Sequence, residues 1–436
     1  MSKALALSVA FLVFACGGDD DERSDPDGGN QPDPETGTPI LERTPLDTHE
    51  CEIVDEPDEV AGDTIGSAVA VVGDSPLVAR ASFGPIGGDD YGSILAVTPV
   101  SFAPVGLGDE AYRTTALEQL RFPTLAASGD GAVLAWVAGD QSDRVMRARL
   151  DSAGDIVGSA TEVAQTDAPA LGLAIAATGP STHVLWIDSA LRVRALDGDG
   201  APLGDATTIR TATVTGAALA TTAEGTVAVW TEGVFGATDG EQDAGVYLAL
   251  LDSDGTVTAG PLRVSATLPE HTFVDMPAVV AAGDELMVAW REHLWEEDPD
   301  GDPGTWDPRG HAVIKVARVD GAGEQVLARE SLQAVEEEIV HLQPALVAQG
   351  GAVALSWSRG MFISVCGGCI SDYKRRLVLL EPRDLVPLGE VIEMVGVTGF
   401  SRATMIEVAG DLAHVLGLDY HAINNLAVAR TTCSPR

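Results

Sequence analysis

A carboxylate-rich loop at residues 291–307 carries the residues best suited to bind a metal ion. Asp298, Asp300 and Asp302 alternate along this loop around Gly301. Ca²⁺ prefers several converging oxygen ligands, and alternate carboxylates on a tight turn bring their oxygens towards one point. The sequence therefore predicts a calcium site at these three aspartates. The alternative is an acidic loop that is only solvated.

The D-x-D-G-D pattern of residues 298–302 resembles the calcium loops of thrombospondin-type repeats and, more loosely, those of EF-hands. Arg309 stands where an EF-hand places its bidentate glutamate, so the resemblance covers the aspartates alone. The same loop contains Trp295 and Trp306. Exposed together, they would form an aromatic platform for a sugar or a peptide. The alternative is that they pack against the body of the protein.

A pair of cysteines offers a second kind of chemistry. Cys366-Gly367-Gly368-Cys369 has the spacing of a redox motif or of one half of a zinc site. A zinc site needs a second pair of ligands, and none lies nearby in the sequence. A redox motif of the thioredoxin type needs a following helix, which the pattern does not indicate. A small disulfide between Cys366 and Cys369 is therefore the favoured interpretation.

Enzyme signatures are sparse, because the chain has no G-x-S-x-G, H-E-x-x-H, P-loop or G-x-G-x-x-G motif. The D-x-D-G turns resemble the Asp boxes of sialidases, although the S-x-D-x-G-x-T-W pattern is not matched. A hydrolase of the sialidase or glycosidase type would need a pair of carboxyl groups, for which Glu232, Glu292 and Asp419 are candidates. No catalytic residue is assigned.

A repeat positions these residues. It consists of a glycine, a brief turn and an apolar run that usually ends at tryptophan, as in residues 129–136, 179–186, 283–290 and 350–357. Another copy ends at Trp230, and degenerate copies occupy residues 73–80 and 410–417. An Ala-rich segment precedes each copy, and a third apolar run follows it, often before a D-x-x-G turn. Short Val, Leu and Ala runs between Gly and Asp turns indicate strands.

Repeats of this kind predict an all-β fold, a seven-bladed β-propeller of four-stranded antiparallel blades. Small first strands fit beside the crowded axis, and the tryptophans fill the gaps between blades. A pair of β-sandwiches is the competing fold. A short amphipathic helix is expected within residues 331–342. The blades are expected at residues 62–115, 116–165, 167–211, 213–265, 266–333, 334–395 and 396–433.

The N-terminus has the pattern of an exported lipoprotein. A short apolar stretch ends in Val13-Phe14-Ala15-Cys16, which resembles the lipobox of bacterial lipoproteins. The resemblance implies a signal peptide at residues 1–16, lipidation of Cys16 and, because Gly17 follows the cysteine, the outer membrane as destination. Residues 17–39 are acidic and almost free of apolar side chains, so they are predicted to be a disordered tether to a propeller at residues 40–436.

The last repeat lacks a fourth strand, and the apolar residues around 51–54 have no blade of their own. An N-terminal strand is therefore expected to complete the C-terminal blade and to remove its exposed edge. Four cysteines remain besides Cys16, an even number that suggests disulfides in an exported protein. Cys51 lies in the closing strand and Cys433 follows its expected partner strand, so a Cys51–Cys433 disulfide is the preferred pairing.

Long connections between second and third strands are expected at residues 83–92, 232–245, 291–311 and 359–375. In a propeller these connections share one face with those that lead to the next blade, and long loops on a rigid scaffold commonly carry function. This face is the predicted ligand site. Its candidate ligand-binding residues are Asp188, Glu232, Arg291, Glu292, Trp295, Trp306, Arg359 and Asp419.

The net charge of −40, from 66 acidic and 26 basic residues, makes the surface repel nucleic acid and excludes nucleic-acid binding. The sequence thus predicts a monomeric, lipid-anchored binding or scaffold protein on the periplasmic or surface side of the outer membrane. Its ligand would be a protein or a glycan, and its only implied cofactor is calcium. A sialidase-like hydrolase is the first alternative, and a structural subunit of an envelope assembly complex is the second.

Overall fold

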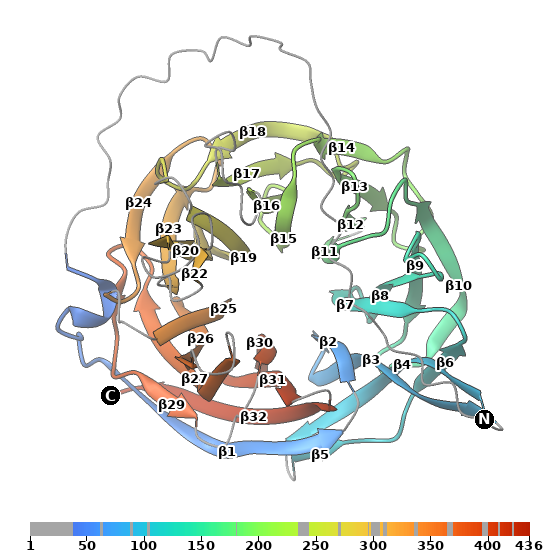
Figure 1. Ribbon diagram of the computed structural model, residues 1–436, viewed down its shortest axis with the longest axis horizontal. Helices are drawn as coiled ribbons and strands as arrows, with labels where there is room; N and C mark the ends of the chain where they lie inside the picture. The colour runs from blue at the N-terminus through green and yellow to red at the C-terminus, as the bar shows by residue number, and fades with distance from the viewer. Residues whose placement is uncertain are drawn as a thin grey trace. The chain divides into compact units, whose positions relative to one another are not determined.

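The computed structural model shows a β-propeller in which successive antiparallel sheets surround a central channel (Figure 1). Strands account for almost all of its regular structure, and the described helical element is the 3-10 turn Ile40–Glu42. The structure describes residues 38–61, 64–87, 90–102, 105–179, 181–233, 244–268, 272–294, 296–297, 306–307, 312–334, 339–363, 369–394, 400–408, 410–420 and 423–436.

Blades 2, 3 and 4 are simple four-stranded meanders, with the first strand innermost and the fourth outermost. Blade 2 contains β7 (Leu120–Ser128), β8 (Gly131–Ala138), β9 (Arg144–Leu150) and β10 (Ile156–Gln165). Blade 3 contains β11 (Gly172–Thr178), β12 (Ser181–Ile187), β13 (Leu191–Leu196) and β14 (Thr207–Arg210). Blade 4 contains β15 (Val214–Thr221), β16 (Thr226–Glu232), β17 (Gly245–Leu251) and β18 (Val257–Arg263).

Blades 1, 5 and 6 elaborate the same plan. Blade 1 contains β2 (Thr64–Val72), β3 (Ser75–Gly87), β4 (Asp90–Phe102), β5 (Val105–Leu107) and β6 (Tyr112–Ala116). Blade 5 contains β19 (Thr272–Ala282), β20 (Glu285–Leu294), β23 (Ala312–Asp320) and β24 (Val326–Ser331). Blade 6 contains β25 (Ile339–Gln349), β26 (Ala352–Ile363), β27 (Cys369–Glu381), β28 (Val386–Pro387) and β29 (Ile392–Met394). One parallel bridge, Ala312 to Val340, joins blades 5 and 6 into a nine-stranded sheet.

Blade 7 closes the ring as predicted. It contains β30 (Phe400–Val408), β31 (Asp411–Tyr420) and β32 (Ile423–Pro435), and its outermost strand is β1 (His49–Ala61) from the other end of the chain. Figure 1 shows β1 running beside β32. Cys51 and Cys433 face each other in this pairing and form the predicted disulfide. Around the axis, each innermost strand contacts that of the next blade, and β30 contacts β2.

Each gap between neighbouring blades holds its own apolar cluster, because every blade presents apolar side chains on both faces of its sheet. The tryptophan that ends a second strand packs against the preceding blade: Trp230 lies with Leu185 and Val193 of blade 3. Ile40 fills the gap between blades 5 and 6 beside Trp357. The repeat tryptophans are therefore core residues, and all five are at most 3% exposed.

The D-x-x-G turns join third and fourth strands as expected. In the turn that begins at Asp151, the carboxylate Oδ1 accepts the backbone N–H groups of Ala153 and Asp155 at 2.9 and 3.0 Å. Gly154 takes a φ of +91°, a conformation that residues with a side chain rarely adopt. The aspartates of these turns thus satisfy the local backbone.

Two local predictions were wrong. The stretches expected as loops at 83–92 and 359–375 are extended hairpins, paired as far as Gly87 with Asp90 and Ile363 with Cys369. Pairing satisfies their backbone groups within the sheet, whereas an open loop would leave them to water. The expected helix within 331–342 is also absent from the described part of that segment, where Ile339 begins β25 and buries Val340 and Leu342.

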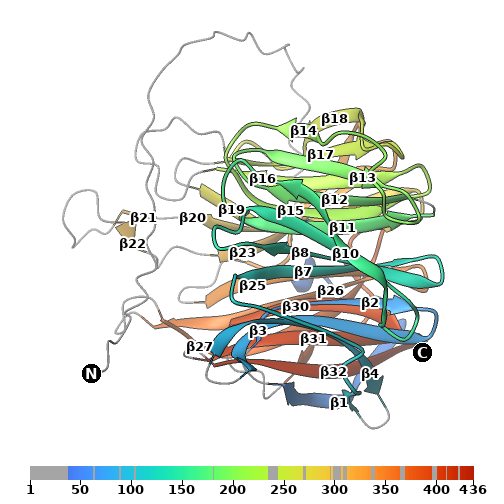
Figure 2. The same ribbon diagram turned by 90° about the vertical axis from the view of Figure 1, so that its right-hand side faces the viewer.

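Figure 2 shows the ring from the side, with the two-stranded hairpin of β21 (Glu296–Glu297) and β22 (Trp306–Asp307) lying outside the blades. Among the residues that the structure describes, no helix is long and apolar enough to cross a membrane.

Candidate functional site

The mouth of the central channel contains a cavity of about 360 Å³. Its walls come from Ile187 at the end of β12 and from the first halves of the innermost strands of blades 2 to 6. We call this opening the mouth, and the mouth face is the one with the second-to-third and the blade-to-blade connections. The cavity is lined by Phe122, Leu171, Gly172, Leu173, Ile187, Thr215, Gly216, Ala217, Asp275, Met276, Pro277, Gln343 and Pro344.

Three of these residues have an uncommon backbone conformation. Phe122, Met276 and Gln343 have φ angles of +51°, +52° and +53°, and a proline follows each of them. Side chains disfavour this left-handed region, so the surrounding sheet must hold it in place. At each position the pairing register of the innermost strand shifts. The bulges bend the strand ends and make these residues part of the cavity wall.

Gly216 in blade 4 also shapes the wall of the cavity. A Cβ atom at this position would lie 2.8 Å from Cδ of Pro277, the proline of the neighbouring bulge. Only glycine allows the two strands to approach so closely. The mouth therefore combines three proline bulges with one glycine contact, and its shape is built into the innermost strands.

A second cavity, of about 240 Å³, continues along the channel beside blades 1 and 2. It shares Phe122 and Leu173 with the mouth cavity and is otherwise lined by inner-strand residues such as Ser67, Ala68 and Thr124. Small side chains on these strands leave the axis open. The candidate site is thus a depression, lined by polar and apolar atoms in similar measure, that leads into the channel.

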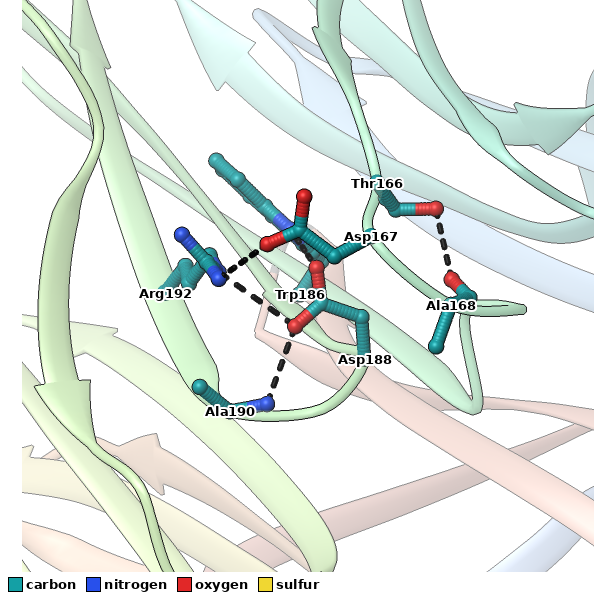
Figure 3. A network of polar contacts seen from close by, with 7 residues as sticks. All are labelled: Thr166, Asp167, Ala168, Trp186, Asp188, Ala190 and Arg192. Carbon is teal, nitrogen blue, oxygen red and sulfur yellow. Dashed lines mark hydrogen bonds and ion pairs between the residues drawn. The ribbon is translucent and has the colours of Figure 1, made fainter.

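Asp188, a predicted ligand-binding residue, belongs to a polar cluster between blades 2 and 3 (Figure 3). Its Oδ2 accepts the indole N–H of Trp186 at 3.3 Å, and its Oδ1 accepts the backbone N–H of Ala190 at 2.9 Å. Arg192 bridges the carboxylates of Asp188 and Asp167 at 3.3 and 2.6 Å. The side chain of Asp188 is 1% exposed, so these contacts occupy it within the protein.

Glu232 has the same arrangement in blade 4. Its Oε1 accepts the indole N–H of Trp230 at 2.6 Å, and Arg210 of blade 3 grips both carboxylate oxygens at 2.8 and 3.0 Å. The hydrogen bond to Glu232 raises the pKa of Arg210 above its usual value. Arg210 also lies 5.8 Å from the ring centre of Tyr247, which stacks on Trp230. Glu232 therefore links two blades.

In blade 5, Glu292 repeats this contact. Its Oε1 accepts the indole N–H of Trp290 at 2.9 Å, while Lys315 lies 3.8 Å from Oε2. Arg291 points to the other side of the strand and forms a two-fold pair with Asp275 of the mouth wall, at 2.7 and 2.5 Å. The charge of Asp275 is thus balanced where it lines the cavity.

In blade 6, Trp357 donates to a histidine and not to an acid. Its indole N–H binds Nδ1 of His341 at 3.2 Å. Burial lowers the pKa of His341 to about 3, and the charges of Arg359 and Arg376 act in the same direction. His341 pairs with Arg359 in the sheet, so Arg359 lies next to this neutral imidazole. None of these contacts tests ligand binding by Asp188, Glu232, Arg291, Glu292 or Arg359, which stays a prediction.

Several other predicted site residues lie outside the described part of the chain. These are Cys16, Trp295, Asp298, Asp300, Asp302 and Cys366. For Trp306, Cys369 and Asp419 the structure gives the strand but not the side chain. The described residues contain no group of three His, Cys, Asp or Glu side chains that could hold a metal ion. The calcium site and the Cys366–Cys369 disulfide therefore stay predictions.

The mouth face also carries exposed apolar side chains that were not predicted from the sequence. Phe83 and Tyr91, 55% and 64% exposed, lie on the extended hairpin of blade 1 with ring centres 6.4 Å apart. Leu171, at the edge of the cavity, is 65% exposed. The available signal for the mouth was the recurrence of a bulky residue followed by proline near the start of an Ala-rich strand.

Comparisons with known proteins do not assign this chain to a family. No protein-family model matches the sequence, and no curated protein matches it. Among solved structures, the chain is similar to a subtype N10 neuraminidase-like protein of A/little yellow-shouldered bat/Guatemala/060/2010, with 11% sequence identity and a TM-score of 0.43. That match covers 73% of this chain and 96% of the other. A structural similarity this low does not indicate an activity.

Proposed function

We propose that this chain is an exported, lipid-anchored binding protein that holds its ligand at the mouth of the propeller. The observation that carries the proposal is the cavity of about 360 Å³, because the first halves of five innermost strands converge on it. Ligand sites are commonly concave and combine apolar surface with polar groups that orient the ligand, and this lining offers both, with Leu171 and Ile187 beside Thr215 and Asp275. The strained bulges at Phe122, Met276 and Gln343 support the same site, since such backbone strain concentrates where function requires it.

The contacts of the acidic residues favour binding over hydrolysis. A glycosidase needs a pair of carboxyl groups that are free to transfer a proton and to attack the sugar or activate water. Glu232 and Glu292 each accept an indole N–H and contact a cation, which suits a structural role, between two blades for Glu232 and within blade 5 for Glu292. Turnover of a glycoside that is lost in Glu292→Gln, while folding is kept, would favour the hydrolase.

The ligand we propose is a protein segment or a glycan with an apolar part that enters the mouth. Leu171 supplies an uncovered apolar contact at the edge of the cavity, and Phe83 and Tyr91 offer a further apolar surface on the same face. The lipid on Cys16 and the acidic tether at residues 17–39 would hold this propeller near a membrane, on the periplasmic or surface side of the outer membrane.

A substitution at the edge of the mouth tests the proposal. The full chain should bind N-phenyl-1-naphthylamine, a neutral apolar fluorophore, at one saturable site. Leu171→Arg should abolish this binding, because the charged side chain would occupy the mouth. Leu203→Arg is the matched control, since Leu203 is 45% exposed and lies away from the cavity. Both variants should melt like the wild type. Absence of binding, or equal effects of the two substitutions, would contradict the proposal.

The natural ligand can be sought with the same pair of variants on peptide and glycan arrays. A ligand of the mouth should be retained by the wild type and by Leu203→Arg and lost by Leu171→Arg. Envelope proteins that co-purify equally with all three chains would instead support a structural subunit of an envelope assembly complex.

A further inference from the structure

Arg375 in β27 is a cation in the interior of blade 6. It is fully buried, with 0% of its surface exposed. Its guanidinium donates to three neutral oxygens: the backbone oxygen of Gln343 at 2.9 Å, Oγ of Ser356 at 2.8 Å and Oγ of Ser358 at 3.2 Å. No carboxylate in the described part of the chain pairs with it. Burial of a charge without an opposite charge is costly, so this position calls for an explanation.

The other tryptophan blades show that the fold does not need a cation here. The strand pairing places Arg375 opposite the residue that follows the blade tryptophan. The residues in the same register of blades 2, 3, 4 and 5 are apolar and fully buried: Val145, Leu191, Val246 and Ile314. The cation is therefore a feature of blade 6 and not of the repeat.

Arg375 lies directly behind the wall of the mouth. Gln343, whose backbone oxygen it binds, has the left-handed conformation of a bulge and lines the cavity. Burial lowers the pKa of Arg375 to about 9, so the group still carries its charge at neutral pH. Burial lowers the pKa of His414 in blade 7, and the charge of Arg375 acts in the same direction. We expect this charge to give a positive potential on this side of the mouth.

The neighbouring charges do not cancel this potential. Lys374 and Arg376 flank Arg375 in the strand and both bind Glu393, at 2.7 and 3.0 Å. At the mouth itself, Asp275 is paired with Arg291. A buried charge acts through a medium of low dielectric constant and is screened by salt much less than surface charges are.

We infer that the mouth selects apolar ligands that carry a negative group, such as a carboxylate or a sulfonate, and that Arg375 is the residue responsible for this preference. The inference rests on the proposed function, because it assumes that the mouth is the ligand site. Arg375 would not touch the ligand. It would act through its charge. In a protein with a net charge of −40, most of the surface repels such anions.

Two fluorophores with the same aromatic rings, one neutral and one anionic, separate the effect of the Arg375 charge from that of the shape of the mouth. 8-Anilinonaphthalene-1-sulfonate is N-phenyl-1-naphthylamine with an added sulfonate. The wild-type full chain should bind both at the mouth and prefer the anion. Arg375→Met should reduce that preference about tenfold, the ratio that corresponds to about 1.4 kcal/mol, and should leave the affinity for the neutral probe unchanged. Arg376→Met removes the same charge from the adjacent position, whose partner is Glu393, and should leave the preference intact.

The outcomes distinguish the inference from the proposed function. If the neutral probe does not bind the wild type at the mouth, the proposed function fails. If the neutral probe binds but Arg375→Met weakens both probes equally, Arg375 only shapes the wall and the inference is overturned. If Arg375→Met does not fold, the salt dependence of the wild type tests the inference by itself. A preference for the anion that persists in about 1 M NaCl supports a buried cation, while its disappearance assigns it to surface charge and overturns the inference.

Discussion

Trp230 donates its indole N–H to Glu232 at 2.6 Å, and the two residues lie on the same side of one strand. In a strand, residues two positions apart point to the same face. The sequence W-x-[D/E] therefore places a carboxylate beside the indole N–H, as it also does for Trp186 with Asp188 and Trp290 with Glu292. A buried indole N–H needs an acceptor, and the acid supplies it.

Removal of the Glu232 charge should therefore lower stability. Glu232→Gln keeps the size of the side chain but weakens the contacts with Trp230 and Arg210. We expect a loss of about 2 kcal/mol in the free energy of unfolding, a value that already allows for solvent around the half-exposed Arg210. Urea denaturation measures it. The control is Glu224→Gln, an exposed acid of the same blade, which should leave stability unchanged. Equal stability of the two variants would contradict the structural role of Glu232.

The fold was predictable because its signal is repeated. A glycine turn followed by an apolar run that ends in tryptophan marks the first two strands of a blade. Seven copies of this pattern indicate a ring of blades. The closing strand was predictable because the last repeat lacked a strand and residues around Cys51 lacked a blade. The disulfide to Cys433 confirms that reasoning.

The site was less predictable, since its features depend on packing between blades. The acids after the tryptophans looked like free rim residues, although the period of two in W-x-[D/E] could have shown that they face the indole. For the cavity wall at Phe122, Met276 and Gln343, the only indication in the sequence was the proline that follows each residue. Arg375 gave no signal at all, because Tyr373-Lys374-Arg375-Arg376 reads as a solvated basic run and only the fold buries its third member.

The Cys51–Cys433 disulfide should contribute strongly to stability. The two residues are separated by 382 positions, so the bond removes much entropy from the unfolded chain. Chain-entropy reasoning gives about 6 kcal/mol as an upper value. Cys433→Ser should lower the melting temperature under oxidising conditions, whereas wild type and variant should melt alike in reductant. A difference that persists in reductant would contradict a role for the disulfide.

Chelation tests the calcium site that the sequence predicts. If Asp298, Asp300 and Asp302 bind Ca²⁺ in the folded state, the ion stabilises that state, and EDTA should lower the melting temperature of the full chain. Asp300→Asn should melt lower than the wild type and should no longer respond to EDTA. Asp254→Asn, which alters an acidic turn of blade 4, should respond as the wild type does. An unchanged melting temperature of the wild type in EDTA would remove the calcium site.

Two of the buried histidines, His341 and His414, should make the propeller sensitive to mild acid. Burial lowers the pKa of His341 and of His414 to about 3, whereas an unfolded chain has a histidine pKa of about 6.5. The folded state therefore keeps both rings neutral, and their contribution to stability is complete above pH 6.5 and lost as the pH falls towards 3. At pH 5, which is about 1.5 units below the unfolded pKa, each ring should cost about 2 kcal/mol.

His414→Gln isolates this effect, because Gln does not titrate and its amide can still contact Thr431, the partner of His414 at 3.2 Å. The drop in the free energy of unfolding between pH 7.5 and pH 5 should be about 2 kcal/mol smaller in this variant than in the wild type. Urea denaturation at both pH values measures it, with His49→Gln as the control at a partly exposed histidine. If His414→Gln and His49→Gln lose stability in acid to the same extent, His414 does not enter the folded state as a neutral ring.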